Sequence, residues 1–171
     1  MHCRNIYNKR IDFKTLANEF PEFKRHTVLD LKGRVTLDFK DAEAVRALST
    51  TLLKKDFDLD VYFPKNGLIP TVPLRLNYIL FIEDLLRSLN RIECIKGLDI
   101  GTGSSCIYPL ISAKKNGWHM IGTDINCDTV NCAQQNVVTN ALTHLVQVVH
   151  VKKKSILREI LERDKTSLRE N

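Results

Sequence analysis

A short motif that combines acid and glycine residues is the clearest chemical feature of this 171-residue sequence. Asp99, Gly101 and Gly103 close an apolar run, and glycines there permit a tight turn and close approach of the backbone to a ligand. Asp124 ends the next apolar run about 20 residues later, where a carboxylate can accept hydrogen bonds from both hydroxyls of a ribose. Together these residues predict a nucleoside-binding site.

The acid in this motif favours S-adenosylmethionine over a dinucleotide. A dinucleotide fingerprint has a third glycine where this sequence has Cys106, and it holds a pyrophosphate at the helix N-terminus. A carboxylate before the first glycine suits a cationic ligand, and S-adenosylmethionine carries a sulfonium and an ammonium group but no phosphate. An NAD-type oxidoreductase and a plain strand-to-helix turn are the alternatives. The motif therefore predicts a cofactor site made by Asp99, Gly101, Thr102, Gly103 and Asp124.

The elements around the motif alternate between strand and helix after residue 90. Such alternation implies right-handed crossovers and a parallel sheet, as in an α/β fold of the class I, Rossmann-like type. Hydrophobic periodicity predicts strands at 95–100, 119–123 and 145–149. It also predicts three helices, of which the first follows the glycine motif and ends near Lys115, and the others span 128–140 and 155–164.

Residues 1–90 read instead as an N-terminal helical extension, so we divide the chain into 1–90 and 91–171. A helix at 12–23 should end near Pro21, and alternating residues at 34–39 predict a strand. Asp41 can cap a further helix. After a loop at 64–70, a last helix begins near Thr71 or Val72 and carries Pro73 and Arg75 in its first turn.

Composition narrows the class of protein. No segment approaches the roughly 20 apolar residues of a membrane span, and the polar first ten residues are unlike a secretory signal. The odd number of cysteines, 5, without a Cys-x-x-Cys pair argues against a disulfide framework or a zinc finger and for a reducing compartment. The net charge of +6 arises from residues 1–34 and 150–171, which suits a polyanionic partner; a solvated basic surface is the alternative.

Several blocks resemble the U6 small nuclear RNA adenosine methyltransferases, the methyltransferase-like protein 16 family, whose bacterial relatives methylate adenine in large-subunit ribosomal RNA. The most specific blocks are Leu68 to Tyr78, with Pro-Leu-Arg-Leu-Asn-Tyr, and Gly97 to Pro109, with Gly-Ser-Ser-Cys-Ile-Tyr-Pro. The resemblance runs from residue 1 to about residue 157. It implies methyl transfer from S-adenosylmethionine to the exocyclic amine of an adenine in structured RNA such as U6 hairpins, in the nucleus and cytoplasm.

The resemblance also implies roles for single residues. Arg75 matches a family arginine that binds the cofactor, and a guanidinium can hold the methionine carboxylate as a bidentate pair. An arginine on the surface of a helix is the alternative for Arg75. Ser155 stands where the family has a cofactor-site threonine, and a helix cap is its alternative role. An RNA-binding arm matches Arg4, Lys9 and Arg10, for which a disordered tail is the alternative.

One family motif is missing, and no other catalytic set replaces it. The family orients the flipped adenine with Asn-Pro-Pro-Phe after its fourth strand, and the sequence contains no Asn-Pro-Pro. Cys127 and Cys132 have no histidine ligands nearby in sequence, so no metal site is predicted. We therefore assign no catalytic residue and expect an incomplete C-terminal half with weak or no turnover alone. A non-catalytic RNA- or cofactor-binding fragment or paralogue, or a fragment without a stable fold, are the alternatives.

Overall fold

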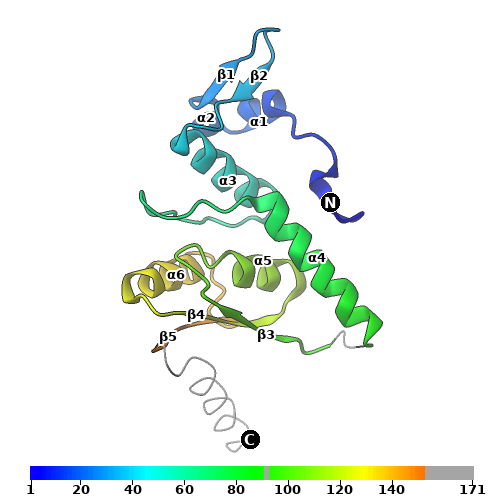
Figure 1. Ribbon diagram of the computed structural model, residues 1–171, viewed down its shortest axis with the longest axis vertical. Helices are drawn as coiled ribbons and strands as arrows, with labels where there is room; N and C mark the ends of the chain where they lie inside the picture. The colour runs from blue at the N-terminus through cyan, green and yellow to red at the C-terminus, as the bar shows by residue number, and fades with distance from the viewer. Residues whose placement is uncertain (91–92, 153–171) are drawn as a thin grey trace, which may run out of the picture.

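The computed structural model describes residues 1–90 and 93–152 (Figure 1). The molecule is elongated, with a small helix-and-hairpin unit at one end and a parallel sheet at the other. Two long helices, α3 (Ala42–Phe57) and α4 (Val72–Ser88), connect the two ends (Figure 1). None of the described helices is both long and apolar enough to cross a membrane.

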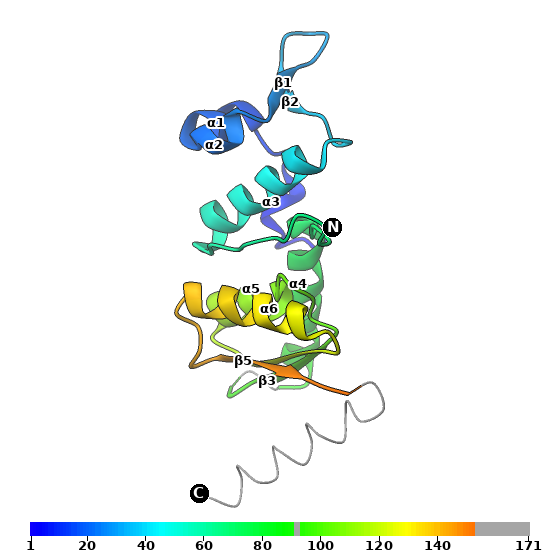
Figure 2. The same ribbon diagram turned by 90° about the vertical axis from the view of Figure 1, so that its left-hand side faces the viewer.

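The sheet contains three parallel strands in the order β3 (Lys96–Ile100), β4 (His119–Asp124) and β5 (Val146–His150). The crossover helices α5 (Ile107–Asn116) and α6 (Cys127–Thr139) lie on the same face of this sheet (Figure 2). The predicted α/β alternation and parallel pairing are therefore confirmed. The helix predicted at 155–164 lies outside the described residues.

The N-terminal unit differs from the predicted extension in two ways. The prediction of a single helix at 12–23 is wrong, because α1 (Phe13–Glu19) ends before Pro21 and a second helix, α2 (Pro21–Lys24), starts at that proline. Proline has no N–H and a fixed φ, so it suits the first turn of a new helix better than the interior of an existing one. The short 3-10 helix η1 (Ile6–Asn8) precedes α1.

The extension is also not purely helical. The predicted strand at 34–39 is confirmed as β2 (Val35–Leu37), and it pairs antiparallel with a strand that was not predicted, β1 (Thr27–Leu29). The side chain of Asp30 forms the turn of this hairpin by accepting hydrogen bonds from the backbone N–H groups of Lys32 and Arg34. Two adjacent residues of β1 are both exposed, so its three residues lack the alternation that identifies a half-buried strand.

The predicted starts of the two long helices are confirmed. The Asp41 side chain accepts a hydrogen bond from the backbone N–H of Glu43 and caps α3. Helix α4 has Thr71 at its N-cap and Pro73 in its first turn. Arg75 therefore lies near the first turn of α4, at the end of this helix that a loop connects to α3.

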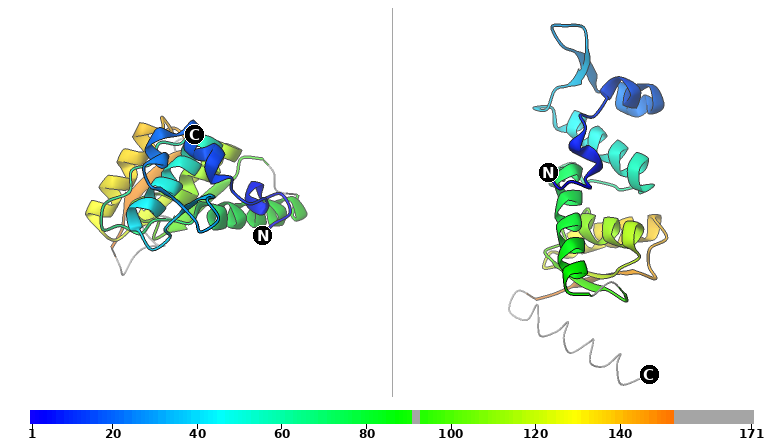
Figure 3. Two further views of the ribbon diagram at one scale, coloured as in Figure 1. Left: turned by 90° about the horizontal axis from the view of Figure 1, so that it is seen from above. Right: turned by 90° about the vertical axis from the view of Figure 1, so that its right-hand side faces the viewer.

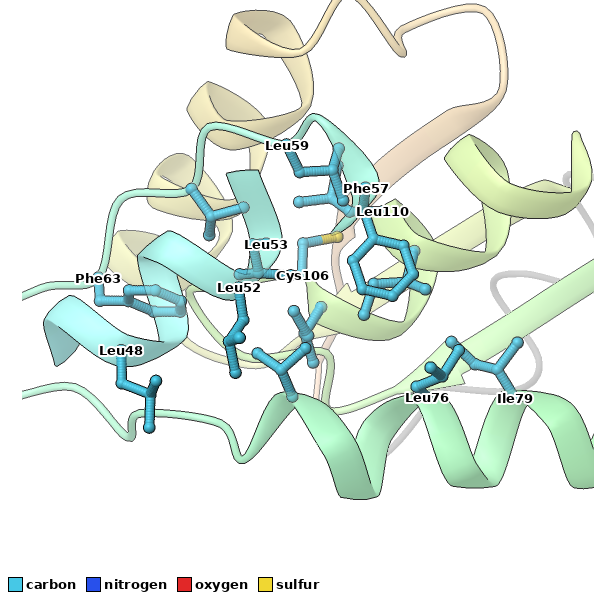
Figure 4. Packing of buried hydrophobic residues seen from close by; sticks show 14 of the residues in the cluster. Leu48, Leu52, Leu53, Phe57, Leu59, Phe63, Leu76, Ile79, Cys106 and Leu110 are labelled. Carbon is cyan, nitrogen blue, oxygen red and sulfur yellow. The ribbon is translucent and has the colours of Figure 1, made fainter. Parts of the chain in front are cut away.

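One hydrophobic core extends through both ends of the molecule. It runs from the N-terminal helices through α3 and α4 to α5, α6 and β5, and Figure 4 shows its central part. Leu53 of α3 and Leu110 of α5 are fully buried, and Leu76 of α4 is 2% exposed. The 1–90 and 91–171 division stays a prediction, and the residues on either side of it share this core.

Polar contacts add to the core where the start of the chain lies beside α4 (Figure 3). Glu83 of α4 is 6% exposed, and its carboxylate accepts hydrogen bonds from Arg4, Lys115 and Asn116. Burial opposes ionisation of this carboxyl, but the three donors outweigh burial and lower the pKa of Glu83. One carboxylate thus connects the N-terminal segment, α4 and α5.

We expect Glu83→Gln to lower the free energy of unfolding by about 2–3 kcal/mol at neutral pH, because it removes the charge from a buried cluster whose cations are partly solvated. Since folding lowers the pKa of Glu83, this contribution is present above the ordinary value of 4.5 and disappears as the pH falls through the folded-state pKa. Urea unfolding followed by circular dichroism at several pH values measures both effects.

Asp84→Asn is the matched control, because Asp84 also contacts Arg4 but its side chain is 48% exposed. We expect Asp84→Asn to lower the free energy of unfolding by less than Glu83→Gln does, because solvent screens the ion pairs of an exposed carboxylate. Equal costs for the two variants would show that burial of the Glu83 carboxylate is not what matters.

Candidate functional site

A turn at the carboxyl end of β3 forms the centre of the site. Gly101 and Gly103 have φ angles of +76° and +68°, in the left-handed region that glycine adopts without strain. The N–H groups of Gly101 and Thr102 both donate to the carbonyl of Thr123 in β4, each at 2.8 Å. Apart from the glycine and its chain neighbours, none of the described residues has a heavy atom within 4 Å of where a Cβ of Gly101 or Gly103 would be, so these residues leave space beside the turn.

A further glycine, Gly122, lies where β4 and this turn are in close contact. A Cβ built on Gly122 would lie 3.1 Å from the Thr102 side chain, which is 6% exposed. Gly122 therefore makes room for Thr102 to pack into the sheet and holds the turn close to β4.

Asp99 precedes the turn and lies on β3. Its Oδ2 atom is buried and has no hydrogen-bond partner. Burial raises the pKa of Asp99 above its usual range, while the Thr102 hydroxyl and the charge of Arg75 act in the opposite direction. The site therefore holds an acid whose charged form lacks a full set of partners.

Arg75 reaches the site from α4. Its Nη1 donates to the hydroxyl of Tyr108 at 2.9 Å, and its guanidinium carbon lies 5.3 Å from the centroid of the Tyr108 ring. That ring packs edge-on against Tyr78, with 5.3 Å between the centroids. Asp99 and both tyrosines line a cavity of about 370 Å³ that follows β3. Two helices and a strand thus bring together groups that are distant in sequence.

Among the described residues, the buried side-chain nitrogen and oxygen atoms without a hydrogen-bond partner are Arg75 Nε and Asp99 Oδ2. One is a cationic donor and the other is a carboxylate acceptor, and leaving either buried and unpaired costs free energy. A ligand with a carboxylate for Arg75 and an ammonium group for Asp99 would satisfy both. An amino acid group has this pair of charges.

Asp124 lies at the carboxyl end of β4, beside the turn. Its Oδ2 accepts from the N–H of Gly103 at 3.2 Å, and its Oδ1 accepts from the N–H of Asn126 at 3.0 Å. A carboxylate has about four lone-pair positions, so these two bonds leave room for further donors such as ribose hydroxyls. The structure thus brings Asp99, Arg75, the glycine turn and Asp124 to one edge of the sheet.

Cys106 caps the start of α5 beneath the turn and is fully buried. Burial raises the pKa of its thiol to about 12, so at neutral pH it is protonated. Its role is packing rather than nucleophilic attack.

The other predicted residues have different surroundings. Arg4 donates to Glu83, Asp84 and the carbonyl of Leu80, so its guanidinium is bound to α4. Lys9 and Arg10 are exposed. Ser155 lies outside the described residues. Within residues 1–90 and 93–152, no three His, Cys, Asp or Glu side chains are grouped to hold a metal ion.

Sequence reasoning missed Tyr78, Tyr108 and, in α6, Asn136. The two tyrosines stand in the blocks that carry the family resemblance, but the contact between them joins α4 to α5. Asn136 is 1% exposed, and it binds backbone groups of Tyr62 and Ser104. The only signal for Asn136 in the sequence is that a polar residue occupies a position on the apolar face of this helix.

Comparison with curated proteins gives close relatives. The RNA N(6)-adenosine-methyltransferase METTL16 of Homo sapiens is 48% identical over 167 residues, which cover 96% of this chain and 30% of the relative. The U6 small nuclear RNA (adenine-(43)-N(6))-methyltransferase of Drosophila melanogaster is 40% identical over 169 residues, covering 98% of this chain and 55% of the relative. The chain therefore spans less than two thirds of the length of either relative.

A solved structure confirms the predicted class I methyltransferase fold. The N-terminal domain of human METTL16 in complex with SAH superposes with a TM-score of 0.86 and 50% identity, over 90% of this chain and 60% of that one. A protein family described as RNA methyltransferase matches residues 1–167. Because this match covers nearly the whole sequence, the chain belongs to that RNA methyltransferase family.

Proposed function

We propose that this chain forms the S-adenosylmethionine-binding part of an RNA N6-adenosine methyltransferase. The observation that carries the proposal is the buried pair of unpartnered atoms, Arg75 Nε and Asp99 Oδ2, beside a glycine turn. The methionine end of S-adenosylmethionine is a zwitterion with the complementary charges. SAH, the same molecule without its methyl group, is bound in a solved relative.

Each residue would hold a different part of the cofactor. Arg75 would bind the methionine carboxylate and Asp99 the ammonium group, while the open space at Gly101 and Gly103 would admit the cofactor against the turn. Asp124 would accept from the ribose hydroxyls. Thr102 would keep the turn against β4, and Ser155 keeps the cofactor role that the family resemblance implies.

The substrate that we propose is structured RNA, with U6-like hairpins as its type. One relative is named for U6 small nuclear RNA, and another was solved with the MAT2A 3'UTR hairpin 1. Lys9 and Arg10 are exposed cations that can neutralise phosphates. Arg4 would join them only if RNA displaced its contacts with Glu83 and Asp84. Nucleus and cytoplasm are the proposed compartments, in keeping with five free cysteines.

The proposed reaction is a direct methyl transfer, in which the protein contributes positioning rather than covalent chemistry. S-adenosylmethionine would supply the electrophilic methyl group. In this chain, Arg75 and Asp99 would hold and orient the methionine end, and the hydroxyl of Tyr108 accepts a hydrogen bond from Arg75. The adenine amine also needs acceptors and a stacking aromatic, and the sequence has no Asn-Pro-Pro-Phe to provide them. We therefore propose cofactor binding by this chain and weak or no turnover by it alone.

Replacement of Arg75 tests the carboxylate contact. We expect Arg75→Ala to weaken S-adenosylhomocysteine binding about 10- to 100-fold in calorimetry, since a charge-assisted hydrogen bond is worth about 1.5–3 kcal/mol. Arg87→Ala, at the other end of α4 and 57% exposed, is the matched control and should change the affinity by less than about twofold. Methylthioadenosine lacks the amino acid group, so its affinity should not depend on Arg75. Equal losses for both ligands would overturn the assignment.

The pH dependence of binding tests Asp99. A cationic group favours the charged form of Asp99, so S-adenosylhomocysteine affinity should fall as the pH is lowered from neutrality through the raised pKa of this carboxyl toward 3.8. Asp99→Asn should bind more weakly at neutral pH and show a flatter profile. Methylthioadenosine again serves as the ligand control. If the unchanged protein showed a flat profile across this range, Asp99 would not hold the ammonium group.

A further inference from the structure

The extended segment between α3 and α4 is held by two asparagines of α6. Asn136 Oδ1 accepts from the N–H of Tyr62 at 2.8 Å, and its Nδ2 donates to the carbonyl of Tyr62 at 3.0 Å. Asn140, one turn later, makes the same pair of bonds with Asp60, both at 2.8 Å. Each amide side chain thus pairs with both backbone groups of one residue, as a neighbouring strand would.

Only one of these asparagines also reaches the glycine turn. Nδ2 of Asn136 donates a second hydrogen bond, at 3.0 Å, to the carbonyl of Ser104, the residue that follows Gly103. The second bond of Asn140 Nδ2 goes to the carbonyl of Asn136 in its own helix. Asn136 is therefore a direct bridge between the segment and the turn, whereas Asn140 is an anchor of the segment alone.

The segment between α3 and α4 is also held by side-chain burial and by contacts with α3. Leu59, Val61 and Phe63 are buried, whereas the backbone groups of the two residues between them hydrogen-bond to α6. The guanidinium of Arg46 in α3 donates to three successive carbonyls, those of residues 63, 64 and 65. The hydrogen bonds of Arg46 thus hold the segment next to Tyr62 against α3. Asn136 connects the backbone of Tyr62 to the carbonyl of Ser104.

We propose that Asn136 is a positioning residue for the cofactor turn, which it holds in its ligand-ready conformation by fixing the Ser104 carbonyl. A turn that is already ordered loses less conformational freedom when a ligand binds. The effect on affinity rests on the proposed function, cofactor binding at this turn. The effect on the turn itself does not depend on that function.

The test compares Asn136→Asp with the matched control Asn140→Asp. Both changes preserve side-chain size and one acceptor but remove the Nδ2 donors. For Asn136→Asp we expect faster amide hydrogen exchange at residues 60–63 and at 101–106, and S-adenosylhomocysteine affinity about tenfold lower. For Asn140→Asp we expect faster exchange near residue 60 only and an affinity within about twofold of the unchanged protein. Circular dichroism confirms that each variant is folded under the conditions of measurement.

A pH series separates positioning from general loss of structure. The carboxyl group introduced by Asn136→Asp regains a donor when it is protonated. The ratio of the S-adenosylhomocysteine affinities of the unchanged protein and this variant should therefore approach one as the pH falls. Asn136→Leu cannot regain a donor, and its ratio should stay constant. If Asn136→Asp and Asn140→Asp had the same effect on exchange at 101–106 and on affinity, the proposal would be wrong.

A measurement on the unchanged protein covers the case in which Asn136→Asp fails to fold. Native-state hydrogen exchange in low denaturant should give residues 60–63 and 101–106 the same opening free energy, because one bridge ties them. Independent opening would overturn the positioning role. Absence of S-adenosylhomocysteine binding by the unchanged protein would instead refute the proposed function and leave the exchange result to decide the inference.

Discussion

Two backbone N–H groups, of Gly101 and Thr102, donate to one carbonyl, that of Thr123, and the geometry of the site depends on this arrangement. It turns the chain sharply at the end of β3 and keeps the turn against β4. The positive φ of Gly101 suits the turn, and the missing Cβ of Gly122 allows the close approach of the Thr102 side chain. Strand register places Asp99 opposite Gly122, so Asp99, before the turn, and Asp124, at the end of β4, lie toward the same end of the sheet.

The cationic half of the site comes from outside the sheet, so it depends on packing rather than on register. Arg75 is carried by α4, whose position is fixed by the shared core and by the hydrogen bonds of Glu83 to α5. The N-terminal segment supports the same helix at its start, since Asn5, 3% exposed, donates to the carbonyl of Pro73. Residues at the beginning of the chain thus help to place a side chain at the edge of the sheet.

The sequence predicts the parts of this structure whose determinants are local. Apolar runs, glycines and acids at strand ends located β3, β4, β5 and the turn, because a parallel sheet brings the carboxyl ends of its strands together. The contact of Tyr108 with Arg75 and that of Asn136 with Ser104 join different elements, so the spacing of residues along the sequence does not predict them. Strand β1 was missed because two adjacent residues of it are exposed, so it lacks the alternation of buried and exposed positions that identifies a half-buried strand. The basic residue Arg4 counts toward a net positive charge in the sequence, yet in the fold its guanidinium contacts two carboxylates.

Arg75 and Asp99 could in principle have neutralised one another in a direct ion pair. Instead the guanidinium donates to the neutral hydroxyl of Tyr108, and an atom of each charged group is left buried without a partner. Each such atom costs about 1–3 kcal/mol in the absence of a ligand. A zwitterionic ligand that satisfies both would regain that free energy on binding, and a ligand that binds only the folded state stabilises it. For such a ligand the unpaired atoms would be a source of affinity, which a direct ion pair between the two side chains would have removed.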